Sequence, residues 1–169
     1  MKRIGLLSDT HGYLDPKIFQ YFEACDELWH AGDIGTMEVV EKLESFKPLR
    51  AVYGNIDGGL IRKSFPLDLR FDCEGLDVWI THIGGYPGRY NKRVREILSL
   101  NPPGLFICGH SHILKVMPDP KYQLLHINPG ACGVHGFHQV KTIIRFSIDE
   151  GVVKDLAVVE LGKRGQISS

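Results

Sequence analysis

The chain has 169 residues, of which 43% are hydrophobic and 24% charged, and its 20 basic side chains balance 20 acidic ones. The zero net charge argues against an extended nucleic-acid partner or a membrane-surface partner. No apolar run approaches the roughly 18 residues of a membrane helix, and the N-terminus lacks the pattern of a signal peptide. We therefore expect a cytoplasmic protein whose four scattered cysteines are free thiols.

The length predicts one domain, residues 1–162, large enough to bury roughly two-thirds of its unfolded surface. Residues 163–169 are mostly polar or small, which is typical of a flexible C-terminal tail. The chain contains no internal repeat, low-complexity tract or linker between domains.

The first third of the chain alternates short apolar runs with amphipathic segments. Runs at residues 3–8, 27–30 and 49–53 predict buried strands, and residues 16–23 and 37–43 predict the helices between them. Strands that alternate with helices pair in parallel through right-handed crossovers. Functional loops then follow the carboxyl ends of the strands.

The rest of the chain is mostly β-structure. Residues 67–73 and 76–81 predict a hairpin, and residues 91–100 an amphipathic helix that Pro102 and Pro103 end. Further strands are expected at residues 105–108, 114–117, 123–127, 142–148 and 152–159. This order predicts an α/β (α+β) fold in which two packed sheets carry helices on their outer faces.

Polar side chains of one chemical kind follow five of the expected strands. The motifs are Asp9-x-His11, Gly32-Asp33, Gly54-Asn55-x-Asp57, His82 and Gly109-His110-x-His112. Carboxylate, amide and imidazole groups together suit Mn²⁺, Fe²⁺ or Zn²⁺ better than Mg²⁺ or Ca²⁺. We interpret these residues as a two-metal site rather than as strand-end residues satisfied by local hydrogen bonds. The candidate ligands are Asp9, His11, Asp33, Asn55, His82, His110 and His112.

In these five ordered motifs the chain resembles the calcineurin-like metallophosphoesterases, and most closely their small single-domain phosphodiesterase branch. The resemblance extends from residue 6 to about residue 133. It implies a four-layer αββα sandwich of two mixed β-sheets flanked by helices. It also implies that one metal ion is held by Asp9, His11 and His112, a second by Asn55, His82 and His110, and that Asp33 bridges both.

The same resemblance implies a two-metal-dependent phosphoesterase, with phosphodiesterase activity favoured over phosphomonoesterase activity. Two divalent transition metal ions are expected, manganese first, with iron, zinc or nickel as alternatives. A metal-bridging hydroxide would attack phosphorus in line. The implied catalytic residues are Asp33, Asn55, His82 and His110.

The chain departs from the family pattern at Ile56, where phosphomonoesterase members usually carry the histidine that protonates the leaving group. A general acid typically contributes about 10²–10⁴-fold to the rate. Its absence predicts a preference for phosphodiesters with good leaving groups, and slow turnover.

Four other polar residues have two interpretations each. Asp57 is expected to orient a ligand or stabilise a turn. His30 either lines the site or is hydrogen-bonded to backbone, and His135 and His138 either donate a proton near the substrate or lie in a surface loop.

Two rival functions remain open. A retromer subunit is similar to this branch and serves as a protein-binding scaffold, so a catalytically weak or inactive metal-binding scaffold is the alternative. The seven intact ligand positions favour the enzyme. A nuclease is the weaker rival, because the neutral charge leaves only small nucleotides as substrates. The expected partners are a small phosphodiester substrate and, through exposed strands, a second copy of the chain in a homodimer or larger homo-oligomer.

Overall fold

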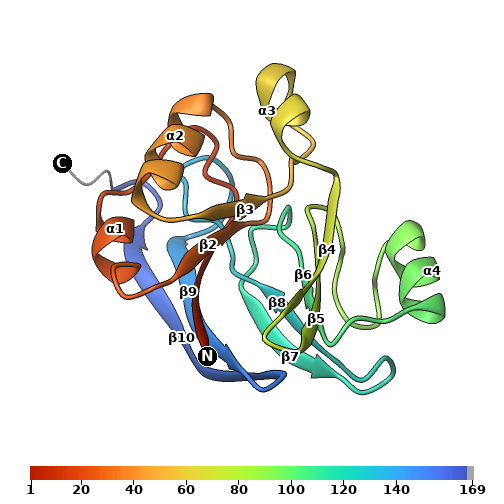
Figure 1. The fold of residues 1–169 in the computed structure, drawn as a ribbon. Helices are drawn as coiled ribbons and strands as arrows, with labels where there is room; N and C mark the ends of the chain where they lie inside the picture. The colour runs from red at the N-terminus through yellow and green to blue at the C-terminus, as the bar shows by residue number, and fades with distance from the viewer. Residues whose placement is uncertain (167–169) are drawn as a thin grey trace.

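The computed structural model of the chain describes residues 1–166 and contains two five-stranded β-sheets packed face to face, with helices outside them (Figure 1). The strands are β1 (Lys2–Leu7), β2 (Glu27–His30), β3 (Leu49–Ala51), β4 (Asp68–Cys73), β5 (Leu76–Thr81), β6 (Leu105–Ile107), β7 (Lys115–Asp119), β8 (Leu124–Asn128), β9 (Val140–Asp149) and β10 (Val152–Lys163). The helices are α1 (Lys17–Tyr21), α2 (Met37–Phe46), α3 (Gly59–Ser64) and α4 (Lys92–Leu100).

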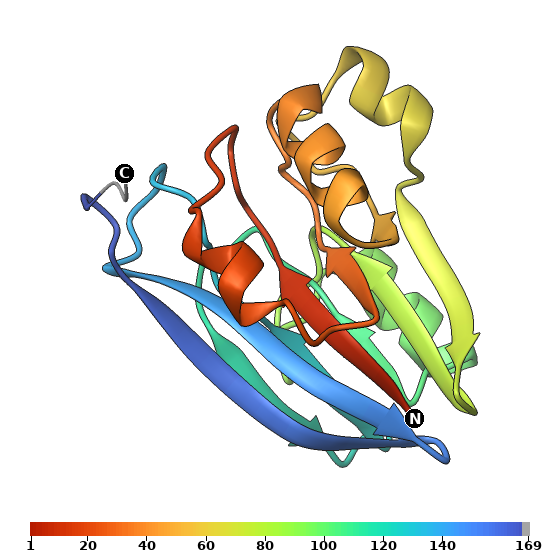
Figure 2. The ribbon, with the colours of Figure 1, turned by 60° about the vertical axis from the view of Figure 1, so that its left-hand side comes forward.

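The first sheet has the strand order β10-β9-β1-β2-β3. Strand β1 pairs in parallel with β2, and β2 with β3, as the alternation of strands and helices predicts. The long strand β9 pairs antiparallel with β1 and extends the sheet on the other side. Helices α1 and α2 cover the outer face of this sheet (Figure 2), where Phe22, Val40 and Leu43 pack on Leu7 and Leu28.

The second sheet has the order β4-β5-β6-β8-β7. The expected β4–β5 hairpin is confirmed, and its turn residues Glu74 and Gly75 have φ of 50° and 85°. Two left-handed residues give a turn whose twist matches that of the flanking strands. Helix α4 begins at Asn91, whose side chain accepts a hydrogen bond from the Val94 amide, and packs on the outer face of this sheet.

Strand residues alternate between two cores because successive side chains point to opposite faces of a sheet. Leu6 and Trp29 face the second sheet, where they meet Ile80 and Ile107, whereas Leu7 faces the helices. The predicted αββα sandwich of two mixed sheets is therefore confirmed.

Some boundaries differ from those expected. Helix α1 is shorter than residues 16–23, and the Asp15 carboxylate accepts a hydrogen bond from the Lys17 amide at its start. The expectation of a flexible tail from residue 163 does not hold for residues 163–166. Lys163 pairs with Val140 in the sheet, and the Arg164 amide donates to the Gln139 carbonyl. The remainder of that expected tail, residues 167–169, lies outside the described residues.

Helix α3 has no counterpart among the expected elements. Among residues 1–166, none of the helices has the length and apolar character needed to cross a membrane.

Candidate metal centre

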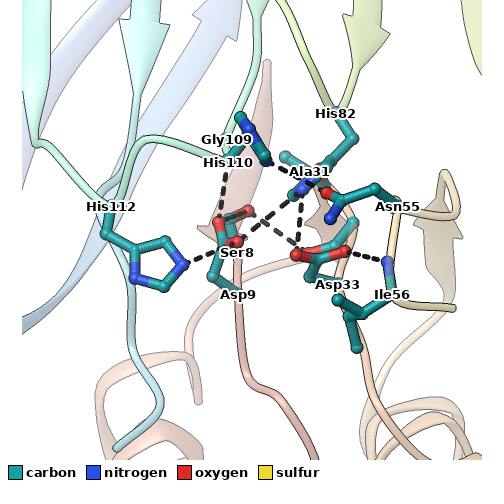
Figure 3. Close-up of polar contacts among 12 residues, drawn as sticks. Ser8, Asp9, Ala31, Asp33, Asn55, Ile56, His82, Gly109, His110 and His112 are labelled. Carbon is teal, nitrogen blue, oxygen red and sulfur yellow. Dashed lines mark hydrogen bonds and ion pairs between the residues drawn. The ribbon is translucent and has the colours of Figure 1, made fainter. Parts of the chain in front are cut away.

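The candidate ligands lie in the loops that follow β1, β2, β3, β5 and β6, at one end of the two sheets (Figure 3). The parallel strands of the two sheets end on this side, so residues far apart in the sequence converge. All seven predicted ligands are close together. Six of them form two groups, Asp9 with His11 and His112, and Asp33 with His82 and His110, and the potential ligand atoms within each group lie within 4.8 Å of one another.

The two groups adjoin each other through their carboxylates. The Asp33 Oδ2 atom lies 3.2 Å from Nε2 of His82 and 3.4 Å from Nε2 of His11, so it faces one histidine of each group. The Asp9 Oδ1 atom lies 3.2 Å from Nε2 of His112 and 3.8 Å from Nε2 of His82. In Figure 3 the Asp9 carboxylate lies on the side of His112, and the Asp33 carboxylate lies beside it on the side of Asn55.

Asn55 lies beside the second group. Its Oδ1 atom lies 3.0 Å from Nδ1 of His110, on the side of Asp33 that faces His82 in Figure 3. The amide of the next residue, Ile56, donates to the other Asp33 oxygen, Oδ1, at 3.1 Å. The loop after β3 therefore supplies a candidate ligand and also orients a carboxylate of the loop after β2.

Three buried atoms at this centre have no hydrogen-bond partner among the described residues: Asp9 Oδ1, His11 Nε2 and His82 Nε2. A buried polar atom left unpaired costs free energy unless another species satisfies it. The Nδ1 atom of His82 lies 2.7 Å from the Ala31 carbonyl oxygen and must donate to it. The Nε2 lone pair of neutral His82 is then available to a cation, as in histidine metal sites. The carboxylate and imidazole donors, and the three unpaired atoms among them, are therefore what a site for divalent metal ions requires.

The charges at the centre agree with this interpretation. Burial opposes ionisation of Asp9, yet the neighbouring imidazoles of His11 and His112 hold its pKa well below the usual value. Burial also opposes a charge on His82, but Asp33 and Asp9 raise its pKa. Two ionised carboxylates among neighbouring imidazoles attract positive charge, which either a proton or a metal ion can provide.

The backbone at the centre is strained. Five of the seven candidate ligands have left-handed φ values: Asp9 (55°), His11 (47°), Asp33 (56°), His110 (69°) and His112 (63°). Residues other than glycine adopt this conformation rarely because the Cβ atom approaches the backbone, and they gather in turns and at functional sites. Gly54, which precedes the candidate ligand Asn55, is needed for space, because a Cβ atom there would overlap Oδ1 of Asp33.

The open interpretations of His30 and Asp57 are now decided. His30 is fully buried and does not line the cavity: its Nδ1 accepts from the Gly32 amide, and its Nε2 donates to Thr10 Oγ1. Burial lowers its pKa to about 4, which keeps the ring neutral. The Asp57 carboxylate accepts from the backbone amides of Ile34, Gly35 and Gly54 and so fixes two ligand loops to each other.

A cavity of about 510 Å³ lies over the candidate ligands. Ile56, which is 49% exposed, lies at its wall, and so do His135 and His138. The His135 ring is 4.8 Å from that of His11, so the loop after β8 belongs to the site rather than to a remote surface. Ser111, Ile113 and Phe137 also line the cavity, and the sequence did not identify them as site residues. The signal that could have identified them is their position next to His110, His112 and His138 in the sequence.

The fold and the two ligand groups define an α/β sandwich protein with a candidate metal centre at its strand ends. The chain belongs to the calcineurin-like phosphoesterase superfamily, whose domain model matches residues 1–151. The resemblance stated from the motifs is thus confirmed, and membership supports a metal-dependent phosphoester hydrolase.

Individual relatives agree with this assignment. The probable metallophosphoesterase MJ0623 of Methanocaldococcus jannaschii is 27% identical over 165 residues, which cover 93% of this chain and 81% of that protein. The structure of an archaeal phosphodiesterase superposes with a TM-score of 0.76 at 23% identity, over 94% of this chain and 99% of the other. Vps29 of Entamoeba histolytica in complex with Zn²⁺ has the same fold, with a TM-score of 0.70 at 15% identity, over 94% of this chain and 98% of the other.

Proposed function

We propose that the protein is a two-metal phosphodiesterase that hydrolyses small phosphodiesters with good leaving groups. In this proposal Asp9, His11 and His112 hold one metal ion. Asn55, His82 and His110 hold the other, and Asp33 bridges the two.

The position of Asp33 carries the proposal. One of its carboxylate oxygens lies within 3.4 Å of a histidine from each ligand group. Two divalent cations at adjacent sites repel each other, so a shared carboxylate between them lowers the cost of holding both. The backbone amide of Ile56 holds the other oxygen of Asp33, which leaves the shared oxygen directed at the two groups.

Divalent metal ions, when bound there, would supply Lewis-acid polarisation of the phosphoryl oxygens and would lower the pKa of a water nucleophile. Manganese is our first choice because the donors are mixed oxygen and nitrogen atoms. The chain's own contribution is to hold the ligands in place. Ser8 Oγ donates to Asp9 Oδ2 at 2.6 Å, and the Ala31 carbonyl fixes the His82 ring. The cavity of about 510 Å³ is large enough for a small ester.

The preference for diesters rests on Ile56. This side chain lines the cavity where the family's monoesterases usually carry their proton donor, and it cannot protonate a leaving group. Substrates whose leaving group departs as a stable anion lose least from this absence. The archaeal protein with the same fold is a phosphodiesterase, which agrees with this choice.

The test is hydrolysis of bis(4-nitrophenyl) phosphate and of 4-nitrophenyl phosphate by metal-free protein, with and without added Mn²⁺. We expect Mn²⁺-dependent cleavage that is faster for the diester and absent in Asp33→Ala, which also controls for contaminating enzymes. Bound metal without turnover above the Asp33→Ala background would contradict the proposal and favour the scaffold alternative.

A further inference from the structure

A second, smaller cavity of about 200 Å³ opens beside the candidate metal centre. Ser111 and Ile113 line both cavities, so the two adjoin at the loop that carries His110 and His112. The remaining walls of the second cavity are Gly85, Tyr86, Lys115, His126 and Asn128. A substrate bound at the metal centre could therefore extend one of its substituents into this space.

Strand register determines which side chains face the second cavity. Lys115 of β7 pairs with Asn128 of β8, and Met117 pairs with His126. Residues two apart share a face of a sheet, so Lys115, His126 and Asn128 all lie on one face. The same face carries Phe106, which pairs with His126 and packs beneath α4.

His126 is an unusual residue to find at this position. Its side chain is 0% exposed, and neither ring nitrogen has a hydrogen-bond partner among the described residues. The Tyr90 and Phe106 rings lie 5.9 and 5.8 Å from it, so a phenylalanine would fit the same aromatic surroundings without unpaired polar atoms. Burial lowers the pKa of His126 to about 4, so at neutral pH the ring offers one N–H donor and one acceptor.

Lys115 supplies a positive charge at the same cavity. Its ammonium nitrogen lies 4.6 Å from the centre of the Tyr86 ring, and none of the ion pairs among residues 1–166 includes Lys115. By contrast, Arg93, in a different cavity beside the centre, is already engaged by Asp68 and Thr81. Lys115 is therefore free to attract an anion.

Ser111 adds a hydroxyl donor. Its oxygen accepts hydrogen bonds from the Ile113 amide and from Asn128 Nδ2, which leaves the hydroxyl proton available. An ammonium group, a hydroxyl and an imidazole N–H around a small cavity form a set of donors, and no carboxylate is among the residues that line it. Oxyanions of phosphate or carboxylate type match such a set.

We propose that this second cavity is a subsite for an additional anionic group, a phosphate or a carboxylate, on one substituent of the phosphodiester substrate. Lys115, Ser111 and His126 would bind that group while the scissile phosphate lies at the metal centre. This inference rests on the proposed function for the identity of the substrate, but the anion site itself can be tested without turnover.

The first test is binding of inorganic phosphate to the metal-free full-length protein, followed through the ring ¹⁵N signals of His126. We expect these signals to shift and saturate in the wild type. In Lys115→Met the apparent Kd should rise about tenfold or more, because a charge-assisted contact is lost. Lys121→Met is the matched control, since Lys121 lies over the Tyr122 ring in the same hairpin but outside the cavity. His126 signals that do not respond to phosphate, or equal affinities in Lys115→Met and Lys121→Met, would overturn the subsite.

The second test compares three 4-nitrophenyl phosphodiesters whose other arm is butyl, 3-carboxypropyl or 3-phosphonopropyl. We expect KM to be about tenfold lower for an anionic arm than for butyl in the wild type and in Lys121→Met. The ratio of KM for the butyl ester to KM for an anionic ester should approach one in Lys115→Met. It should also fall in His126→Phe, which should remain folded because a planar aromatic ring still fills the position. The arm with the lower KM identifies phosphate or carboxylate as the better ligand.

The two proposals fail in different ways. Turnover of all three esters with equal KM would overturn the subsite and leave the phosphodiesterase intact. Absence of turnover for every ester would overturn the phosphodiesterase, and the phosphate titration would still decide whether the cavity binds anions.

Discussion

Several ligand side chains at this centre come from residues whose own backbone conformation is unfavourable. His110 has φ of 69°, and four other candidate ligands are also left-handed. For a residue with a Cβ atom this conformation costs roughly 1–2 kcal/mol, whereas glycine adopts it readily. Strain of this kind persists where surrounding contacts fix the chain and where the resulting side-chain direction is useful.

The strain at His110 can be measured by comparing two truncations, His110→Ala and His110→Gly. Both remove the imidazole, but only alanine keeps the strained Cβ atom, so we expect the glycine variant to be more stable by about 1 kcal/mol in urea unfolding without metal. Both should bind Mn²⁺ more weakly than the wild type in calorimetry.

The control pair is Glu96→Ala and Glu96→Gly, at an exposed position inside α4. Here the glycine variant should be less stable than the alanine variant by about 1 kcal/mol, so the difference has the opposite sign from that at His110. Equal stability of the two His110 variants would show that the left-handed backbone carries no strain.

At the scale of elements, the loops after β2 and β3 act as one unit. The Asp57 carboxylate accepts a hydrogen bond from Ile34 at 3.1 Å, from Gly35 at 2.9 Å and from Gly54 at 2.8 Å. These amides adjoin Asp33 in one loop and Asn55 in the other. A residue that contacts no candidate ligand thus sets the separation between two of them.

Asp57→Asn tests this coupling. The side-chain NH₂ group of asparagine replaces one of the two accepting oxygens, so that a donor then faces a backbone N–H. We expect a loss of about 1–3 kcal/mol in the free energy of unfolding, as for a buried donor left unpaired. Mn²⁺ affinity measured by calorimetry should fall as well.

Asp72→Asn is the control, since this exposed carboxylate accepts one amide in the β4–β5 turn, away from the centre. Wild-type metal affinity in Asp57→Asn would mean that other contacts hold the two loops in register.

At the scale of the whole molecule, the fold could be predicted wherever a local pattern decides the structure. The apolar runs that end before Asp9, Asp33 and His82 are short, and the polar residue after each marks the strand end. Parallel strands of one sheet must end on the same side, so convergence of the ligands carried by each sheet followed from topology.

Features that depend on distant partners could not be predicted in the same way. Residues 163–166 look like a tail, but Arg164 and Gln166 are fixed by Gln139 and Lys141. Left-handed backbone at the ligands, and the unpaired ring of His126, have no signature in the order of residue types. They arise from packing, which sequence patterns describe only through their apolar periodicity.

One buried ion pair connects the loop before α1 with the start of β9, and its lysine also contacts residue 166 near the C-terminus. Lys141 Nζ lies 2.8 Å from Asp15 Oδ2, both side chains are 0% exposed, and the ammonium also donates to the Gln166 carbonyl at 2.7 Å. Burial opposes ionisation of Asp15, but the hydrogen bonds from Lys141 and from the Lys17 amide, together with the charges of both lysines, outweigh it and lower the pKa below 3.8. The pair should therefore matter for the stability of the whole domain.

Replacing Lys141 by methionine removes the ammonium group that lies 2.8 Å from the buried Asp15 carboxylate, and we expect a loss of about 3–5 kcal/mol in urea unfolding at neutral pH. Lys154→Met, which breaks an exposed pair with Asp149, should cost at most about 1 kcal/mol.

Because the folded-state pKa of Asp15 lies below 3.8, its contribution is fully present above pH 3.8 and is lost as pH falls through the lowered value. The difference in stability between wild type and Lys141→Met should therefore shrink on acidification. A double variant, Asp15→Asn with Lys141→Met, should recover part of the loss, since it removes both buried charges. A difference between wild type and Lys141→Met that stays constant down to the acid limit would mean that Lys141 stabilises the fold through packing and its bond to Gln166, and not through the charge of Asp15.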